Sequence, residues 1–347
     1  MEIAVRTSLG RLNWFTSRGW NSARGARDVI TRAALDVLGY GSVEECIKEL
    51  SPQVATVTFL AGAGTRWVTS LPKNVTNWDA KKPRCLFPVE DVLNPGTKIP
   101  IGVYNLRPLR GLGSHYIVWG TEEQKIEDLV NMSGIDKPQY FHQSTRGGDK
   151  PLGHGDAMLQ LMPHIPCDIK YVIANFGGDV NSRKTIEISL MVLAAMQNSD
   201  DYRERISGLL PTANVNNPIY RVKINEEGLP TYFVQQKLLG DVIISGWGQS
   251  NIGVRIYRRS SLENVLGWIQ QMYNLYDDYR MLPGNERKEM PEFGLDHVDG
   301  RMAHTGAFRT LAIADKEEVG EMGERTAVKE YSDIPSFLKA QAALLGI

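Results

Sequence analysis

Apolar and polar positions follow two different rhythms along the chain, and the change falls near residue 53. Residues 26–38 carry apolar side chains at helical spacing, and Gly39-Tyr40-Gly41 ends that helix. The segment Ser42-Val43-Glu44-Glu45 has the form of a capping box and opens a second helix that runs to about Leu50. The first 52 residues are therefore expected to form a helical extension.

From Val54 onward, short apolar runs alternate with amphipathic stretches. The pattern predicts buried strands at 54–60, 115–119 and 169–175, and helices at about 101–111, 121–132, 155–163 and 184–197. Strand–helix alternation of this kind favours a mostly parallel, Rossmann-like sheet with helices on both faces. The expected fold class is α/β.

The pattern changes again over residues 219–258, where short apolar runs are separated only by turn signals. The runs lie at 219–224, 231–236, 241–245 and 252–257, with turns at 225–228 and 246–248. They predict a small antiparallel insert. A helix at about 261–277, a charged polar loop at 281–300 and a helix near 333–345 come next. We expect a helical extension over 1–52, a main domain over 53–325 and a helical tail over 326–347.

Composition and charge exclude some classes of partner. The 347 residues are 42% hydrophobic and 23% charged, with a net charge of -1, so a basic footprint for nucleic acid is absent. No apolar run approaches the length of a membrane span. The three scattered cysteines fit a reducing compartment, and the N-terminus lacks the apolar core of a signal peptide. We expect a cytoplasmic protein with neither nucleic acid nor membrane as partner.

Candidate chemistry begins where the first strand ends, in Leu60-Ala61-Gly62-Ala63-Gly64-Thr65-Arg66. A Gly-x-Gly turn lets bare backbone N–H groups face phosphate oxygens, and Arg66 adds a permanently charged fork beside them. A dinucleotide fingerprint would need a third glycine where Trp67 stands, and the Walker Gly-Lys-Ser/Thr is absent. Most loops of this kind are simply tight turns, so a phosphate-binding role needs support from motifs elsewhere in the chain.

A second segment, Pro83-Arg84-Cys85-Leu86-Phe87-Pro88-Val89, lies beyond a long loop. Together the two segments resemble the signature of the sugar-1-phosphate nucleotidyltransferases, Gly-x-Gly-Thr-Arg followed by Pro-Lys-x-Leu-x-Pro-Val. Arginine stands at 84 where the family has a lysine, and a fork grips phosphate differently from a point charge. The long loop offers other ammonium groups that could serve instead: Lys73, Lys81 and Lys82.

The resemblance extends to a glycine turn, Pro151-Leu152-Gly153-His154-Gly155-Asp156-Ala157, which is similar to the family's Leu-Gly-Thr-Gly-His-Ala segment. In the family this turn reads the edge of the nucleobase, which implies a nucleotide contact for Gly153, His154 and Gly155. A glutamine just upstream reaches the base in the uridylyltransferases, and Gln143 is the counterpart here. The alternative is a plain loop-to-helix turn.

An apolar strand then runs into Gly177-Gly178-Asp179, which places a carboxylate at the carboxyl end of the sheet. The resemblance implies that Asp179 holds Mg²⁺ against the phosphates. The alternative is that Asp179 caps the helix that starts near Ser182. The family's second metal ligand has its nearest counterpart in Asp315, about one position out of place.

The predicted antiparallel insert carries the last two motifs. Tyr232-Phe233-Val234-Gln235-Gln236-Lys237 resembles the family's Val-Glu-Gln-Lys strand, with Gln235 in place of the glutamate and Lys237 toward the sugar phosphate. Ser250-Asn251-Ile252-Gly253-Val254 resembles its Asn-x-Gly-Ile-Tyr strand, in which the asparagine contacts sugar hydroxyls. The resemblance covers about residues 54–320 and leaves the extension unmatched.

The resemblance implies an enzyme that transfers a nucleoside monophosphate from an NTP, with UTP favoured, to a sugar 1-phosphate. Its catalytic cations would be Arg66, Arg84, Lys82 and Lys73, and residues 53–325 would be the catalytic domain. Two alternatives stay open: a non-catalytic relative that binds a nucleotide sugar as a sensor or assembly partner, and a glycosyltransferase that uses a nucleotide sugar. The extension is expected to be either a helical cover on the core or a homo-oligomer contact.

Overall fold

The structure is a computed structural model of the whole chain. It describes residues 2–17, 24–61, 70–72, 78, 82–145, 152–177, 179, 181–200, 205–216, 220–226, 229–235, 247–280, 293–314 and 331–346.

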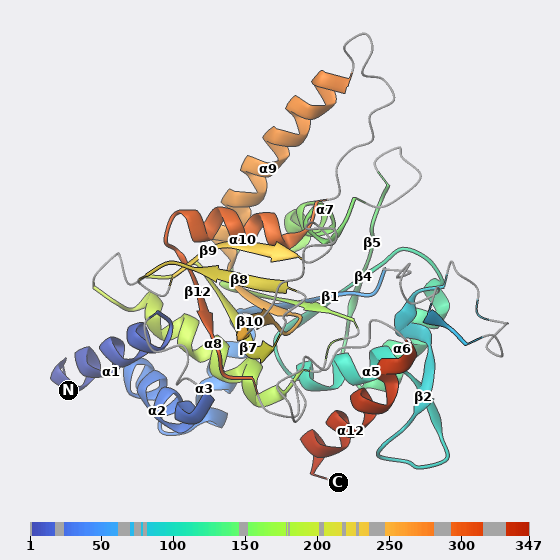
Figure 1. Cartoon of the computed structure of the whole chain (residues 1–347), viewed down its shortest axis with the longest axis horizontal. Coiled ribbons are helices and arrows are strands. Elements are labelled where there is room, and N and C mark those ends of the chain that lie inside the picture. The colour runs from blue at the N-terminus through green and yellow to red at the C-terminus, as the bar shows by residue number, and fades with distance from the viewer. Residues whose placement is uncertain are drawn as a thin grey trace.

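One sheet organises the molecule (Figure 1). Its strand order is β5-β4-β1-β6-β11-β7-β10-β8-β9, with β12 beside β7. The strands are β1 (Val54–Phe59), β4 (Ser114–Trp119), β5 (Gln139–His142), β6 (Tyr171–Phe176), β7 (Gly208–Asn216), β8 (Tyr220–Ile224), β9 (Pro230–Gln235), β10 (Trp247–Asn251), β11 (Val254–Arg258) and β12 (Phe308–Leu311). A separate hairpin pairs β2 (Pro88–Glu90) with β3 (Lys98–Pro100).

The strands β5, β4, β1 and β6 are parallel to one another and form one side of the sheet, with β5 at its edge. β1 and β6 are buried almost throughout because helices cover both of their faces. β11 is antiparallel to β6 and β7, and β10, β8 and β9 continue the antiparallel pairing outward. The α/β fold class, with a parallel part and an antiparallel part in one sheet, is confirmed.

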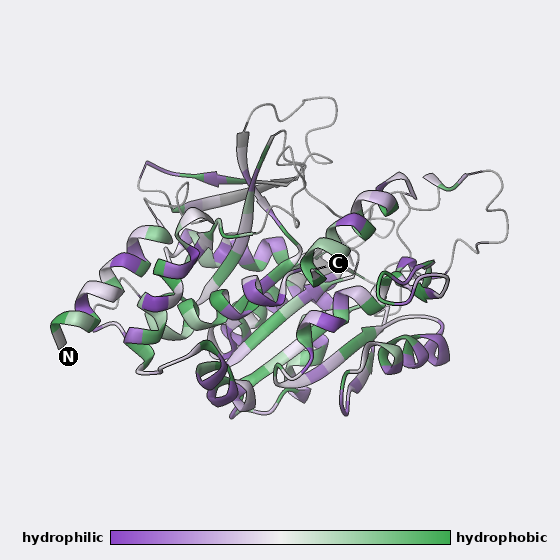
Figure 2. Ribbon diagram, turned by 90° about the horizontal axis from the view of Figure 1, so that it is seen from below, coloured by the Kyte–Doolittle hydropathy of each residue, from purple (hydrophilic) through white to green (hydrophobic). Residues whose placement is uncertain are grey.

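Helices fill both faces, and apolar strands run between helices whose outward turns are polar (Figure 2). They are α1 (Glu2–Phe15), α2 (Arg27–Leu38), α3 (Val43–Leu50), α5 (Ile101–Leu106), α6 (Glu123–Ser133), α7 (His154–Leu161), α8 (Arg183–Gln197), α9 (Arg259–Arg280), α10 (Leu295–His304) and α12 (Ile334–Leu345). Short 3-10 turns lie at Arg24–Ala26, Ser51–Gln53, Arg84–Leu86, Arg107–Leu109, Met162–His164 and Tyr331–Asp333.

Two buried apolar clusters divide these helices between the faces. One cluster joins the sheet to α1, α2, α3, α5, α6, α8 and α12, and the other joins it to α7, α9 and α10. α9 extends away from the sheet in Figure 1. Among the described helices, none combines the length and the apolar content needed to cross a bilayer.

The predicted helical extension is present as α1, α2 and α3. Ser42 caps α3 by accepting from the Glu45 amide, which confirms the predicted N-cap, while the Glu45 carboxylate accepts from the amide of Gly41 rather than from that of Ser42, as a capping box would have it. α2 packs on α8, and Leu12, Ile30 and Ala33 of the extension are fully buried. The boundaries at residues 52 and 325 stay predictions.

Two local predictions are wrong. The turn expected at 246–248 includes the start of β10, a glycine-containing polar strand that is held because β7 and β8 pair with it on both sides. The polar loop expected over 281–300 includes the start of α10, whose core-facing stripe is Leu295, Val298 and Met302. The predicted strand at 241–245 lies outside the described residues.

Candidate nucleotide and metal site

The carboxyl ends of the four parallel strands meet at one edge of the sheet. Phe59 at the end of β1 pairs with Val118 of β4 and with Phe176 of β6. Leu60 continues this edge by donating its amide to the Val118 carbonyl at 2.8 Å. Open α/β sheets bind their ligands at such an edge. The predicted phosphate loop therefore starts from it, while Gly62-Ala63-Gly64-Thr65-Arg66 and Lys73 lie outside the described residues.

Asp179 comes after β6 at the same edge, where it is 2% exposed. Gly253 lies against it with φ +92°, in the left-handed region that favours glycine. A Cβ built on Gly253 would stand 2.2 Å from Asp179 Oδ2, so the glycine is required by this close approach as well as by its backbone angle. The structure thus brings together two positions 74 residues apart that the motif comparison singled out.

Sequence reasoning missed a row of three asparagines, of which the first bonds the Asp179 backbone and the other two support the first. Asn105 Nδ2 donates to the Asp179 carbonyl, and Asn175 Nδ2 donates to the Asn105 carbonyl at 3.2 Å. Asn181 Nδ2 donates to Asn175 Oδ1 at 2.7 Å. All three side chains are buried. The one available signal was an asparagine inside the apolar run of β6, since buried amides require partners.

The alternative that Asp179 caps the next helix does not hold. α8 begins at Arg183, and its N-cap is Ser182, whose hydroxyl accepts from the Thr185 amide at 3.4 Å. The Asp179 carboxylate is therefore not needed for the cap.

Arg84 reaches the same strand end from the 3-10 turn that precedes β2. Its Nη2 donates to the carbonyl of Gly177 at 2.5 Å, two residues before Asp179. This bond orients the guanidinium at the edge of the sheet. The ammonium of Lys82 lies instead over the Trp78 ring, 5.8 Å from its centroid. Burial raises the pKa of the neighbouring Cys85 thiol to about 12, which keeps the thiol protonated near neutral pH.

The glycine turn before α7 is supported by Gln143. The Gln143 side chain is 5% exposed, and its Nε2 donates to the Gly153 carbonyl at 3.0 Å. Gly153 has φ +100° and ψ -179°, a conformation open to glycine. Gly155 is needed for a different reason: the Phe293 ring leaves no room for a side chain, because a Cβ there would stand 2.6 Å from it. The predicted neighbours Gln143 and Gly153–Gly155 therefore lie together.

His154 packs into an aromatic group at the strand ends. Its ring centroid lies 4.6 Å from that of Phe176 and 5.5 Å from that of Phe59, and these two phenylalanines stack at 5.4 Å. His154 thus ties the glycine turn to the ends of β1 and β6.

The positions expected on the acceptor side lie on the antiparallel part. Asn251 is buried, and its Oδ1 accepts from the Gly253 amide at 2.6 Å. Tyr220 of β8 pairs with Gln235 of β9, and Ser250 of β10 pairs with Arg221 of β8. Asn251 and Gln235 therefore fall in one lateral row, with β8 between them. Lys237 lies outside the described residues.

The residues present fit a magnesium ion held largely by phosphates. In the described part of the chain, no three His, Cys, Asp or Glu side chains gather as a metal-binding group. Magnesium in phosphoryl-transfer sites uses one or two carboxylates and takes its other oxygens from water and phosphate. Asp179, held by its backbone and by Gly253, can serve as such a ligand. The predicted second ligand, Asp315, lies outside the described residues.

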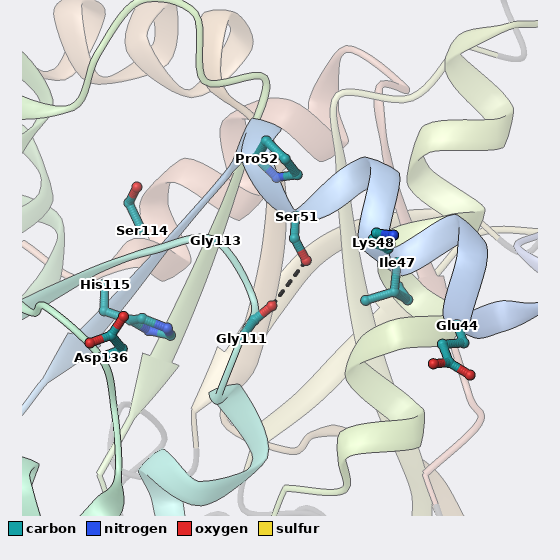
Figure 3. A pocket seen from close by; sticks show the side chains of 10 residues that line it. All are labelled: Glu44, Ile47, Lys48, Ser51, Pro52, Gly111, Gly113, Ser114, His115 and Asp136. Atoms are coloured by element: carbon teal, nitrogen blue, oxygen red, sulfur yellow. Dashed lines mark hydrogen bonds between the residues drawn. The ribbon is translucent and has the colours of Figure 1, made fainter.

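A pocket of about 580 Å³ lies at the opposite, amino end of the strands (Figure 3). His115 and Asp136 stand on one side of it, and Glu44, Ile47 and Lys48 of α3 stand on the other. None of the residues that the sequence assigns to nucleotide, metal or sugar-phosphate binding lines it.

The comparisons with known proteins find similar solved structures, which include two of HddC and one of a pyrophosphorylase. No family model matches, and no curated protein is similar in sequence. HddC from Yersinia pseudotuberculosis has a TM-score of 0.49 at 14% identity over 83% of this chain and 98% of its own. Its complex with GMP-PN has a TM-score of 0.44 at 14% identity over 74% and 88%. A protein assigned as a UDP-N-acetylglucosamine pyrophosphorylase from Entamoeba histolytica has a TM-score of 0.44 at 16% identity over 65% and 63%. At this identity, a function for the chain has to be argued from its own residues.

Proposed function

We propose that this protein is a nucleotidyltransferase that moves a nucleoside monophosphate from an NTP to a sugar 1-phosphate and releases pyrophosphate. The observation that carries the proposal is that motifs distant in sequence meet at one edge of the sheet. The end of β1 at Leu60, the turn at Gly153–Gly155 and the Asp179–Gly253 contact all lie there. Their meeting supports the proposal, because the resemblance assigns all of them to one nucleotide and sugar-phosphate site.

This reaction needs no covalent enzyme intermediate. The protein has to position the two substrates and neutralise the charge of their phosphates. A sugar phosphate oxygen attacks the α-phosphate in line, and pyrophosphate leaves. The Gly62–Arg66 loop would hold the β- and γ-phosphates. Arg84 would stabilise charge on the α-phosphate, and its bond to the Gly177 carbonyl keeps the guanidinium oriented for this. Lys82 and Lys73 are the alternatives for that role.

Asp179 would hold Mg²⁺, with Asp315 as the second ligand. When bound, the ion supplies Lewis-acid stabilisation and a template for the phosphates. The Asn105 bond to the Asp179 carbonyl and the close approach of Gly253 support this role, because they fix the carboxylate at the edge of the sheet.

The glycine turn would contact the nucleobase, and Gln143 would act by holding the turn at Gly153. Asn251, Gly253, Gln235 and Lys237 would line the acceptor side. UTP is the expected triphosphate, because the order of the motifs is most similar to that of the uridylyltransferases.

The test is a panel of four NTPs against common sugar 1-phosphates, scored by pyrophosphate release with Mg²⁺. We expect turnover with one pair, and loss of turnover in Asp179→Asn. Asp168→Asn is the matched control, since Asp168 is an exposed carboxylate before the opposite end of β6. Full activity in Asp179→Asn would refute the metal role. Saturable binding of a nucleotide sugar without turnover would indicate a non-catalytic binding protein. Sugar transfer without NTP-dependent pyrophosphate release would indicate a glycosyltransferase.

A further inference from the structure

A buried arginine lies directly behind the candidate site. Arg255 of β11 is 3% exposed, and its guanidinium is gripped by two carboxylates of α10. Its Nε donates to Asp299 Oδ2 and its Nη2 to Asp296 Oδ1, each at 2.6 Å. Tyr257 reinforces the first pair by donating its hydroxyl to Asp299 Oδ1 at 2.5 Å. These contacts fix the plane of the guanidinium.

The fixed guanidinium packs against Phe176, one of the three aromatic rings at the strand ends. Its Cζ lies 4.8 Å from the centroid of the Phe176 ring, and Phe176 in turn packs against His154 and Phe59. Phe176 is the last residue of β6, so its position sets where Gly177 and Asp179 begin.

The segment that leads into α10 is joined to the glycine turn by Phe293, two residues before the helix begins. Phe293 donates its amide to the Leu152 carbonyl at 2.5 Å and accepts from the Gly155 amide at 2.9 Å. The segment from Phe293 to Asp299 therefore contacts the turn expected to meet the nucleobase directly, and it reaches the strand end expected to hold the metal carboxylate through Arg255.

We propose that Arg255 is a positioning residue that, through Phe176 and with α10, locks the glycine turn and the Asp179 strand end in one geometry. Because Arg255 is buried among Asp296, Asp299 and Phe176, its role in this proposal is to align the groups that meet the substrates. This inference rests on the proposed function, and it adds a link between the two halves of the site that none of the motifs contains.

The kinetic test compares Arg255→Met, which keeps the apolar stem, with Arg255→Lys, which keeps the charge but loses the fork. Arg255→Met should lower kcat for pyrophosphate release roughly 10- to 100-fold, because small misplacements of reacting groups cost that much. The KM for the sugar phosphate should stay near the wild-type value, and Arg255→Lys should restore part of kcat. Arg259→Met is the matched control, since Arg259 bonds Glu263 and the Ile165 carbonyl, and its amide bonds the Lys170 carbonyl just before β6, at the end of that strand opposite the site. It should leave kcat unchanged.

A double-mutant cycle checks the route through the ring. If Arg255 acts through Phe176, Phe176→Leu combined with Arg255→Met should be no slower than the poorer single variant. If the reduction of kcat in the double variant equals the product of the two single reductions, the residues act independently and the proposal is overturned. Wild-type kcat in Arg255→Met would overturn it as well. Asp296→Asn covers the case in which Arg255→Met does not fold, because Asp296 is partly exposed and Asp299 still holds Arg255. It should give a smaller loss of kcat in the same direction, and unchanged kcat would count against the lock.

Amide hydrogen exchange gives a readout that does not need turnover. Loosening of the lock predicts faster exchange in both 152–155 and 171–177 in Arg255→Met. Faster exchange in β11 and α10 alone would contradict it. If the wild type released no pyrophosphate with any pair, the proposed function would fail while this measurement still decided the positioning role.

Discussion

Gly253 and Asp179 lie so close that adding a Cβ at position 253 would displace the carboxylate of the candidate metal ligand. Gly253→Ala must place a Cβ 2.2 Å from Asp179 Oδ2 and must also hold φ near +92°. The backbone strain costs about 1–3 kcal/mol, and the clash displaces the carboxylate. We expect lower stability and loss of Mg²⁺-dependent pyrophosphate release.

Gly96→Ala separates the two effects, because Gly96 has φ +88° with open space around its Cα. It should lose comparable stability in urea denaturation and keep its activity. Wild-type activity in Gly253→Ala would mean that Asp179 is not constrained by this contact.

His115 is a second residue whose environment makes a measurable prediction. Burial, helped by the nearby Arg183, lowers the pKa of His115 to about 4, and its Nδ1 lies 2.5 Å from the Thr56 hydroxyl. Between about pH 6.5 and 4 the unfolded chain binds a proton that the folded protein does not. Stability should therefore fall with falling pH, by up to roughly 3 kcal/mol from this group.

His115→Asn keeps an oxygen that can accept from Thr56 and removes the titration. We expect urea denaturation from pH 7 to 4.5 to show a shallower loss of stability than in the wild type. Burial raises the pKa of Asp299 to about 6, which gives the opposite slope, but it is common to both proteins and cancels in the difference. His304→Asn, at an exposed position, is the control. An unchanged slope in His115→Asn would contradict the burial effect.

At the scale of elements, the sequence pattern predicted those whose own residues carry the signal. β1, β6 and α8 are apolar runs, and they lie within two residues of the predicted bounds. β7 contains Pro211 and β10 is largely polar, so their pairing comes from neighbouring strands rather than from their own propensity. The motifs likewise predicted that Asp179 and Gly253 belong to one site. The bond from Asn105 to Asp179 and the ion pairs of Arg255 join residues that are far apart in the sequence and belong to no motif. They could therefore not be predicted before the tertiary packing was known.

Helix caps near and far from the site should differ in their effect on activity. Ser42 caps α3 and Ser182 caps α8, so replacing either with alanine should cost ~1 kcal/mol of stability. Ser182 lies three residues after Asp179, and fraying of the α8 N-terminus should loosen that segment. We expect Ser182→Ala to lower kcat several-fold and Ser42→Ala to leave it unchanged, in parallel thermal and kinetic assays. Equal activity in the two variants would show that the α8 cap serves stability alone.

At the scale of the whole molecule, the parallel and antiparallel parts form one continuous sheet. β11 joins them, pairing with β6 on one side and β7 on the other. The candidate nucleotide residues lie on the parallel part, and the candidate acceptor residue Asn251 lies on the antiparallel part. The position of Gly253 between β10 and β11 is therefore the point at which the acceptor side meets Asp179. Single-element changes at this junction are expected to affect both sides.

Whether the helical extension unfolds together with the sheet can be tested through the contact between α2 and α8. α2 packs on α8, and α8 is buried along its length from Thr185 to Met196 except at Glu187. Ile30 of α2 is fully buried, so Ile30→Ala should cost about 2–5 kcal/mol. If the extension unfolds together with the sheet, this cost should accelerate amide exchange in β1 and β6 as well as in α2. Val29→Ala, at a neighbouring position that is 45% exposed, should change neither. Faster exchange confined to α1–α3 would instead make residues 1–52 an independently unfolding unit, because a cavity beside α8 destabilises the sheet only when both belong to one cooperative core.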